Sequence, residues 1–406
     1  MPSGRSSRAM AERYSWHMPL DSQSKLNIAI VTKEWPPEIY GGAGVHVINL
    51  VESLKKFSDT QVRVHCFGSE RPDASAYQLS PALENLNSAM KTLLLDMDIA
   101  EKLANVDLVH SHTWYANFTG FLAAKIFEIP HVITSHSLEP LRPWKADQLG
   151  GGYSISSWIE QISYEHAERI IAVSDAVRAD ILKVYPKISQ ERIVTIRNGI
   201  DTDVFRPIRN NEIINLHNIK DKFAIFVGRI TRQKGLIHLL RSWKNIPKEF
   251  GLVIAATNAD EPQIFEEVQE LIIELQKERE NVIWIREKLP QKDLIALLTH
   301  AELFVCPSVY EPLGIVNLEA MACETAVVAT AVGGIPEVVT DGLTGILINQ
   351  SNSDEEFERS LSAGILKVMS DSSLAESLGK NGRIRAVSEF SWDKVAAQTI
   401  DLYRSI

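Results

Sequence analysis

FVCPSVYEPLGIVNLEAMACETAVVATAVGGIPEVVTDGLTGIL, residues 304–347, decides the fold of the second half of the chain. Its pattern predicts a strand, an acidic loop, a helix that opens at Gly314, a second strand and a Gly-rich turn. Glu311 lies on the loop and Glu319 in the first turns of the helix. A helix N-terminus attracts anions such as phosphate, and carboxylates accept hydrogen bonds from sugar hydroxyls. The stretch therefore predicts a nucleotide-sugar site.

Short apolar strands alternate with helical segments on both sides of this stretch. Such alternation is typical of a parallel sheet that is covered by helices on both faces. We predict an α/β protein with two doubly wound halves and a ligand cleft between them, at the carboxyl ends of the strands. The predicted strands are 26–32, 61–67, 106–110, 130–135, 169–174 and 192–197, and then 223–227, 252–257, 282–285, 303–306, 326–329 and 345–348.

The polar connection 198–222 is the best boundary between the two halves. We expect a disordered extension over 1–24, an N-terminal acceptor-side domain over 25–203 and a C-terminal donor-binding domain over 204–388. We also expect a final helix over 389–406, capped by Ser391. One option for this helix is to pack back onto the N-terminal domain.

Bulk composition narrows the function classes. The chain has 406 residues, a net charge of −10 and three cysteines without CxxC spacing. The charge argues against nucleic acid and anionic membranes as partners. The cysteines sit in apolar runs and predict reduced core thiols in a cytoplasmic protein. No apolar run reaches the length of a membrane span, and the first 24 residues lack the apolar core of a secretory signal.

Two Gly-rich loops follow strand ends, one in each half. Gly41, Gly42 and Gly44 form a loop before a helix, which suits a phosphate but is equally typical of a plain turn. The motif Gly228-Arg229 to Lys234-Gly235 places two cations at the mouth of the second sheet, where they can clamp a diphosphate. A solvated basic turn is the alternative.

Histidines and aromatic residues mark the strand ends of the first half. His136 ends a predicted strand and can donate a hydrogen bond to a sugar hydroxyl. His112 and Trp114 follow another strand end and are candidates for the acceptor side of the cleft. Arg142 and Lys145, in the loop after His136, would form a cationic pocket for a phosphorylated acceptor, with a solvated loop as the alternative.

Metal-binding patterns are weak in this sequence. Asp96/Asp98 and Asp201/Asp203 spell DxD, but one pair falls in a predicted helix and the other in the connection, where Asp makes turns and caps. The string His110-Ser111-His112 lacks a third ligand at suitable spacing. We therefore predict neither a metal site nor a cofactor.

Several motifs together resemble the family-4 retaining glycosyltransferases, which have two facing Rossmann-like domains (the GT-B fold). They are Glu311 to Glu319, Gly228 to Gly235, the Asn-Gly-Ile-Asp string at 198–201, and the Gly-rich segment 333–345. In the first half, YGGAGVHV, VHSHTWY, HSLEPLRPWK and QLGGGY resemble the actinobacterial-type glycogen synthases and α-maltose-1-phosphate synthases of that family. The resemblance covers the chain from about Lys25 to its end.

The resemblance implies roles for individual residues. Arg229 and Lys234 would neutralise the donor diphosphate, and Glu311 would hold the hydroxyls of the transferred sugar. Glu319 would hold the nucleotide ribose, and His136 would face the transferred sugar. The remaining donor contacts would come from Gly42, Gly314 and Ile315. Family members are typically metal-independent.

The function implied is retaining transfer of glucose from ADP-glucose, or UDP-glucose, with formation of an α-1,4 bond. We favour glucose 1-phosphate as acceptor, giving α-maltose 1-phosphate in α-glucan biosynthesis. Elongation of an α-glucan chain is the alternative within the class. A nucleotide-sugar epimerase and a non-catalytic binding protein are alternatives outside it, and the oligomeric state stays open, a homodimer included.

Overall fold

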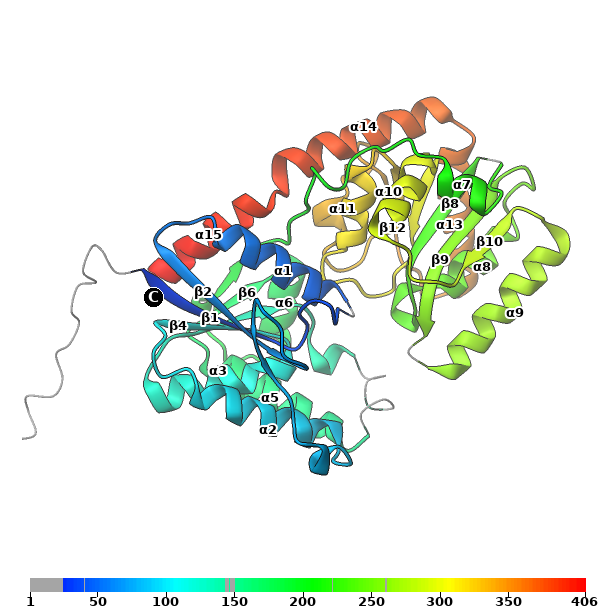
Figure 1. Cartoon of the computed structure of the whole chain (residues 1–406). Coiled ribbons are helices and arrows are strands. Elements are labelled where there is room, and N and C mark those ends of the chain that lie inside the picture. Colours follow the sequence, from blue (N-terminus) through cyan, green and yellow to red (C-terminus); the bar gives the residue numbers. More distant parts are fainter. Residues whose placement is uncertain (1–24, 40, 143–145, 147–149, 221, 260) are drawn as a thin grey trace, which may run out of the picture.

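The computed structural model describes residues 25–39, 41–142, 146, 150–220, 222–259 and 261–406. Two α/β lobes lie side by side, each built on one parallel sheet (Figure 1). The two-domain, doubly wound architecture predicted from the sequence is confirmed. The predictions for residues 1–24 and for Lys145 concern positions outside the described residues.

The first lobe contains a sheet of order β3-β2-β1-β4-β5-β6-β7, with every neighbouring pair parallel. Its strands in chain order are β1 (Leu26–Thr32), β2 (Thr60–Phe67), β3 (Ser75–Tyr77), β4 (Leu108–His112), β5 (His131–Ser135), β6 (Arg169–Ala172) and β7 (Ile193–Thr195). Its helices are α1 (Gly42–Leu54), α2 (Ser88–Glu101), α3 (Trp114–Phe127), α5 (Gly152–His166) and α6 (Asp175–Val184).

The second lobe contains a parallel sheet of order β10-β9-β8-β11-β12-β13. Its strands are β8 (Phe223–Ile230), β9 (Gly251–Ala259), β10 (Val282–Ile285), β11 (Leu303–Cys306), β12 (Ala326–Thr330) and β13 (Ile346–Ile348). Its helices are α7 (Glu212–Leu216), α8 (Leu236–Trp243), α9 (Pro262–Glu278), α10 (Gln291–His300), α11 (Ile315–Ala322), α12 (Ile335–Val338), α13 (Asp354–Met369) and α14 (Ser372–Glu389).

Alternating side chains of β1 show why both faces of the first sheet are buried. Ile28 and Ile30 pack into a cluster with α1 and with the last helix, α15 (Trp392–Arg404). Ala29 and Val31 pack on the other face, against α2 and α3. Successive side chains of a strand point to opposite faces, so a strand covered on both sides reads as a continuous apolar run.

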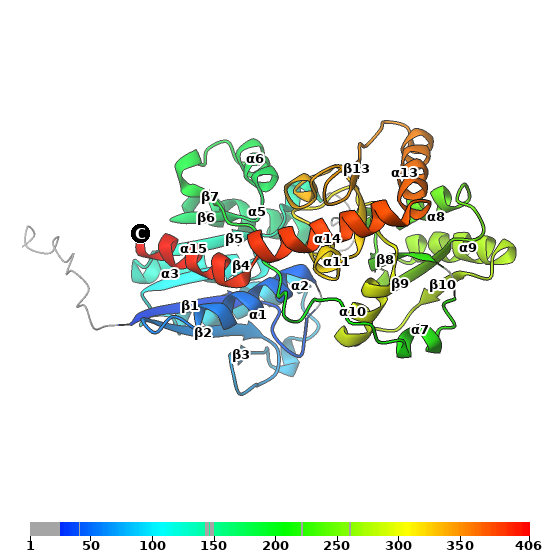
Figure 2. The same ribbon diagram turned by 90° about the horizontal axis from the view of Figure 1, so that it is seen from above.

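The last two helices connect the lobes. α14 packs against α11 and β12 of the second lobe, whereas α15 packs against α1 of the first. Figure 2 shows these helices running in succession across the molecule. The Tyr403 hydroxyl lies 2.5 Å from Nδ1 of His110 inside the first lobe. The final segment of the chain thus completes the core formed by its first segment.

Two sequence-based predictions of local structure were displaced. The strand expected at 106–110 is β4, Leu108–His112, so His112 as well as His110 lies inside the sheet. α1 begins at Gly42, so Gly42 and Gly44, which were expected in the loop, belong to the helix. β3, a three-residue strand at the edge of the sheet, was not predicted.

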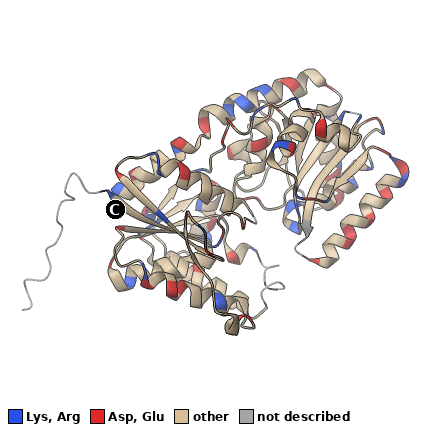
Figure 3. Cartoon of the chain, viewed as in Figure 1, with Lys and Arg blue, Asp and Glu red and all other residues tan. Residues whose placement is uncertain are grey.

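The surface and the cysteines agree with the composition. Figure 3 shows acidic and basic residues interspersed along the outer helices. Cys66, Cys306 and Cys323 are buried free thiols, as predicted. None of the helices in the described part of the chain combines the length and apolar character needed to cross a membrane.

The packing of α15 gives a stability prediction. Ile400 is 1% exposed and lies in the cluster shared by α1, α15 and β1. Truncating a buried isoleucine to alanine leaves a cavity and typically costs about 2–5 kcal/mol. We expect Ile400→Ala to lower the free energy of unfolding of the first lobe by this amount in urea denaturation. Asp401→Ala, on the exposed side of the same helix, is the control and should change it by less than about 0.5 kcal/mol. Equal effects of both changes would contradict this packing.

Candidate active site

A cleft of about 440 Å³ opens between the two lobes. The loops that line it follow the carboxyl ends of β1, β4 and β5 in the first lobe and of β8 and β11 in the second. In an open parallel sheet these ends are where ligands bind. Predicted site residues at the cleft are Gly42, Trp114, His136, Arg142, Arg229, Lys234, Glu311, Gly314 and Ile315.

The loops of the two lobes approach each other closely at one end of the cleft. A Cβ placed on Gly42 would lie 3.7 Å from Cδ1 of Ile315 in the opposite lobe. Gly42 begins α1, and Ile315 begins α11. Two helix N-termini therefore face the same space, and each presents free N–H groups to it.

Lys234 and Glu311 form an ion pair at the wall of the cleft. Lys234 Nζ lies 2.6 Å from Glu311 Oε2, and both side chains are at least four-fifths buried. Burial alone would lower the pKa of Lys234, but the Glu311 carboxylate raises it above its ordinary value. Ser308 donates a second hydrogen bond to Glu311, at 3.3 Å. Lys234 is therefore held in its charged form.

Close backbone contacts position the loop that carries Glu311. A Cβ on Gly235 would lie 2.0 Å from the carbonyl oxygen of Pro307, and one on Gly333 would lie 2.0 Å from that of Glu311. Both glycines also have positive φ, 65° and 52°, a conformation that other residues rarely adopt. The loop is thus enclosed by the turns that follow β8 and β12.

Gly314 and Glu319 lie where the sequence predicted them, on the loop before α11 and within α11. Gly314 has φ 93° and precedes the helix as its N-cap. Glu319 is half-buried and is not among the described residues that line the cleft. Burial raises the pKa of Glu319 to about 7, and nearby Lys234 opposes the shift.

Arg142 lines the first-lobe side of the cleft, as the acceptor-side prediction requires. Its side chain is 16% exposed, and Nη1 lies 3.7 Å from Glu139 Oε1. Nη1 also donates to Ser137 Oγ at 3.1 Å. Arg142 Nε is buried without a hydrogen-bond partner among the described residues. The guanidinium is thus held through Nη1, while its Nε–H is still available as a hydrogen-bond donor.

Glu139 and Glu160 form an acidic pair that lines the cleft together with Arg142, and the sequence did not reveal this pair. The Glu160 carboxylate accepts from the backbone N–H of Glu139 at 2.9 Å and from the Tyr185 hydroxyl at 2.6 Å. Burial, together with the Glu139 charge, raises the pKa of Glu160 to about 8. The spacing of these residues gives no sign of this, because the contacts join α5 and α6 to the loop after β5.

His136 lies at the cleft, but His112 does not line it. His112 is fully buried in β4, and its Nδ1 lies 3.1 Å from Nε2 of His136. The expectation that His112 contacts the acceptor directly therefore needs correction, since the side chain sits behind His136. Burial and the His46 and His110 rings hold the pKa of His136 well below its ordinary value, so its ring is neutral.

Lys33, Glu34 and His46 are further site residues that the sequence analysis missed. Lys33 and Glu34 line the cleft directly after β1. The sequence could have revealed them, because residues that follow the carboxyl end of a parallel strand lie where ligands bind. Lys33 Nζ lies 3.8 Å from the centre of the Tyr115 ring. His46, on α1, gave no signal in the sequence, because its partner Asn198 is 152 positions away.

The DxD strings occupy structural positions. Asp96 is fully buried and accepts a hydrogen bond from the Thr119 hydroxyl at 2.6 Å. Asp201 Oδ1 accepts from the backbone N–H groups of Asp203 and Val204 at 3.0 Å. These contacts are a core hydrogen bond and a turn.

Comparison with known proteins agrees with this geometry. Residues 40–204 match the family model described as Glycosyltransferase Family 4, and residues 208–385 match Glycosyl transferases group 1. The α-maltose-1-phosphate synthase of Mycobacterium tuberculosis is 46% identical over 387 residues, 94% of this chain and 100% of that protein.

Solved structures share the fold. Sucrose-phosphate synthase from Thermosynechococcus elongatus superposes with a TM-score of 0.76 at 23% identity, over 94% of this chain and 99% of that one. Anabaena HepE in complex with UDP-glucose gives 0.74 at 18% identity, over 94% and 100%. Two facing parallel-sheet lobes, a cleft between them and a relative that matches along nearly the whole chain lead to one conclusion: the chain belongs to the family-4, group 1 glycosyltransferases and is a hexosyltransferase of the GT-B fold.

Proposed function

We propose that this enzyme transfers glucose from ADP-glucose to glucose 1-phosphate with retention of configuration and forms α-maltose 1-phosphate. The observation that carries the proposal is the presence of cations on both sides of one cleft. Arg229 and Lys234 line it from the second lobe, and Arg142 lines it from the first. A phosphorylated acceptor needs a cation opposite the diphosphate of the donor, whereas a neutral glucan does not. The 46% identity to a protein named α-maltose-1-phosphate synthase supports the same choice.

The donor site is assigned to the second lobe. Arg229 and Lys234 neutralise the diphosphate, together with the N–H groups at Gly314 and Ile315 and the Gly42 loop across the cleft. Glu311 accepts hydrogen bonds from the hydroxyls of the transferred glucose, and Glu319 accepts them from the ribose. His136, held neutral, donates a hydrogen bond to the transferred sugar.

A front-face reaction fits these groups. The departing diphosphate takes the proton of the acceptor hydroxyl as the new bond forms on the same face. Negative charge then builds on the leaving oxygen, where Arg229, Lys234 and the α11 N-terminus stabilise it electrostatically. A double displacement would need a carboxylate beneath the anomeric carbon. Glu311 is the one lining carboxylate that the sequence analysis offered for that role, and its pairing with Lys234 favours binding over attack.

The acceptor is tested by product analysis. The enzyme is incubated with ADP-glucose or UDP-glucose and with either glucose 1-phosphate or glycogen, and the products are identified by mass and by the proton coupling at the new anomeric carbon. We expect a disaccharide phosphate with an α-linkage from ADP-glucose and glucose 1-phosphate. Product from glycogen alone would refute the proposed acceptor, and a change in the configuration of the donor sugar without transfer would indicate an epimerase.

A variant of Arg142 separates the two substrates in that assay. Arg142→Gln removes the acceptor cation and leaves Arg229 and Lys234 in place. The KM for glucose 1-phosphate should rise at least about tenfold, since a charged hydrogen bond is worth about 1.5–3 kcal/mol, while the affinity for ADP-glucose stays within twofold. Equal losses for both substrates would argue against an acceptor site at Arg142.

A homodimer and a cytoplasmic location remain predictions.

A variant of Lys234 tests whether Arg229 and Lys234 bind the donor diphosphate. Lys234→Ala removes a charge that stabilises the leaving group, so turnover should fall by about 10²–10³. Far-UV circular dichroism checks that the fold is intact. Arg232→Ala is the matched control, since this exposed cation lies two residues away on the same turn, and its turnover should stay near that of the wild type. Near-normal turnover in Lys234→Ala would contradict the assignment.

The raised pKa of Glu319 leads us to expect that donor binding depends on pH. Its pKa of about 7 means that the carboxylate is ionised at pH 8 and largely protonated at pH 6. If only the ionised form binds the ribose, the Kd for ADP-glucose rises about tenfold between pH 8 and pH 6. Titration calorimetry measures this change. Glu319→Gln cannot ionise and should bind weakly at every pH, with a flat profile. The same pH slope in both proteins would assign the titration to another group.

A further inference from the structure

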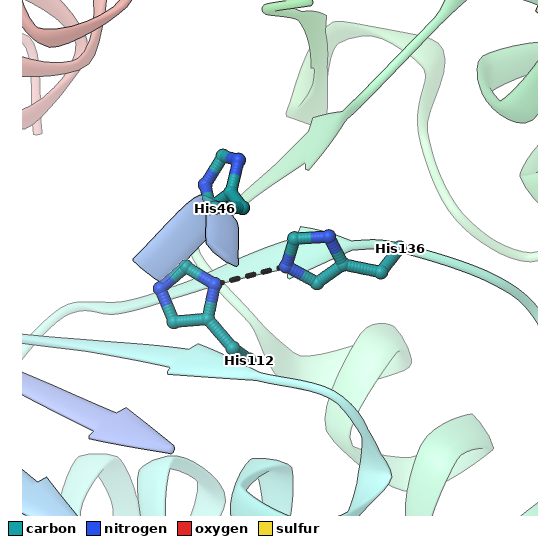
Figure 4. A group of neighbouring side chains, drawn as sticks. All are labelled: His46, His112 and His136. Carbon is teal, nitrogen blue, oxygen red and sulfur yellow. Dashed lines mark hydrogen bonds between the residues drawn. The ribbon is translucent and has the colours of Figure 1, made fainter. Parts of the chain in front are cut away.

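Three histidines from three separate elements meet beside the catalytic cleft. His46 comes from α1, His112 from β4 and His136 from the loop after β5 (Figure 4). One ring nitrogen from each lies within 4.8 Å of the other two. The ring centres of His46 and His136 are 4.8 Å apart, and those of His112 and His136 are 5.4 Å apart. Chain segments up to 90 residues apart therefore present nitrogen ligands to one small volume.

Two ring nitrogens of these three histidines are buried and have no hydrogen-bond partner among the described residues. They are Nε2 of His46 and Nε2 of His112. The other ring nitrogen of His112, Nδ1, lies 3.1 Å from Nε2 of His136. A buried polar atom without a partner costs about 1–3 kcal/mol, so each such atom in a native protein calls for an explanation. Two in one cluster, next to a third imidazole, indicate that the protein retains unused ligand capacity at this position.

The protonation state suits a metal ligand. Burial lowers the pKa of His46 to about 4, against an opposing hydrogen bond to Asn198. Burial and the neighbouring rings hold the pKa values of His112 and His136 well below the ordinary value. All three rings are therefore neutral at physiological pH, and a neutral imidazole is the form that binds metals.

Asn198 fixes the orientation of His46. Its Oδ1 lies 2.7 Å from Nδ1 of His46, inside the buried region. With the proton of Nδ1 donated to this oxygen, the lone pair is left on Nε2. This is the arrangement of protein metal sites, where the second ring nitrogen of a ligand histidine donates to a carbonyl or carboxylate.

We propose that His46, His112 and His136 bind a divalent ion of the zinc type, and that the bound ion inhibits the enzyme. Three imidazoles select zinc, cobalt, nickel or copper over magnesium and calcium, which prefer oxygen ligands. Zinc binds imidazole nitrogen at about 2.0–2.1 Å, so ligands on one ion lie at most ~4.2 Å apart. The 4.8 Å span requires at least one ring to rotate inward. Since His136 faces the transferred sugar, its capture removes it from the reaction.

Metal binding is tested without any substrate. The apoprotein, treated with chelator, is titrated with Co²⁺, and the visible absorption of the ion reports nitrogen ligation. We expect one equivalent to bind with a band typical of low coordination number, and Zn²⁺ to displace it. His46→Asn should weaken binding at least about tenfold. His65→Asn is the matched control, because His65 is also buried in the first lobe but hydrogen-bonds to Tyr77, and it should bind Co²⁺ like the wild type.

Inhibition is tested in the transfer assay. Micromolar Zn²⁺ should lower turnover at least fivefold, EDTA should restore it, and Mg²⁺ should have no such effect. Zn²⁺ should inhibit His46→Asn much less than it inhibits His65→Asn, relative to the rate of each variant without metal. Thermal melting with and without Zn²⁺ adds a readout that needs no activity, since a ligand of the folded state raises the Tm.

The outcomes separate this proposal from the proposed function. Absence of Co²⁺ binding at 100 µM, or equal binding by wild type and His46→Asn, would overturn the metal site whatever reaction the enzyme catalyses. Binding without loss of turnover would overturn the inhibitory role. The proposal that the metal inhibits the enzyme rests on the role of His136 in the proposed reaction. The proposal that the three histidines bind a metal does not. A different product in the acceptor assay would therefore refute the proposed function and leave the metal site standing.

Discussion

The backbone of the loop that carries Glu311 has almost no freedom, and the site depends on that constraint. Gly235 and Gly333 approach its carbonyl oxygens so closely that a Cβ at either position would collide with it. Gly334 does the same, with a Cβ position 2.3 Å from the Pro312 oxygen. Collisions with backbone cannot be relieved by a side-chain rotation. The loop is therefore fixed by neighbours on both sides before any ligand arrives, which is the preorganisation that electrostatic catalysis requires.

The same loop also sets the relation between the lobes. Ser174 of the first lobe donates to the Pro312 carbonyl at 2.6 Å. Nearby, the Glu337 carboxylate of α12 accepts from the N–H groups of Asp175 and Ala176 at the start of α6, both at 3.0 Å. Arg197 donates to Glu337 as well, at 2.7 Å. One apolar cluster includes residues of both lobes on this side. The loop that carries Glu311 and the first lobe are thus held together by hydrogen bonds and by a shared apolar core.

The sequence located the sheets and the strand-end loops well, because parallel strands buried on both faces leave a strong apolar signal. It also predicted that Lys234 and Glu311 lie at the cleft, since both belong to recognisable local motifs. His112 was misplaced because a shift of β4 by two residues put it inside the sheet. His46, Glu139 and Glu160 could not be found, because their contacts join distant segments. Local spacing says which loop reaches the cleft but not what lies behind it.

The position of α15 has a consequence for synthesis. Trp392, Val395, Ala396, Ile400 and Tyr403 belong to the same core as β1 and α1. Gly199 is packed so tightly against Trp392 that a Cβ there would lie 2.8 Å from its ring. As the chain leaves the ribosome, N-terminal segments normally fold first. The face of the first lobe that α15 covers cannot be covered before residues 392–404 have been synthesised, so the apolar side chains of α1 on that face stay exposed on the nascent chain after the rest of the first lobe has been made.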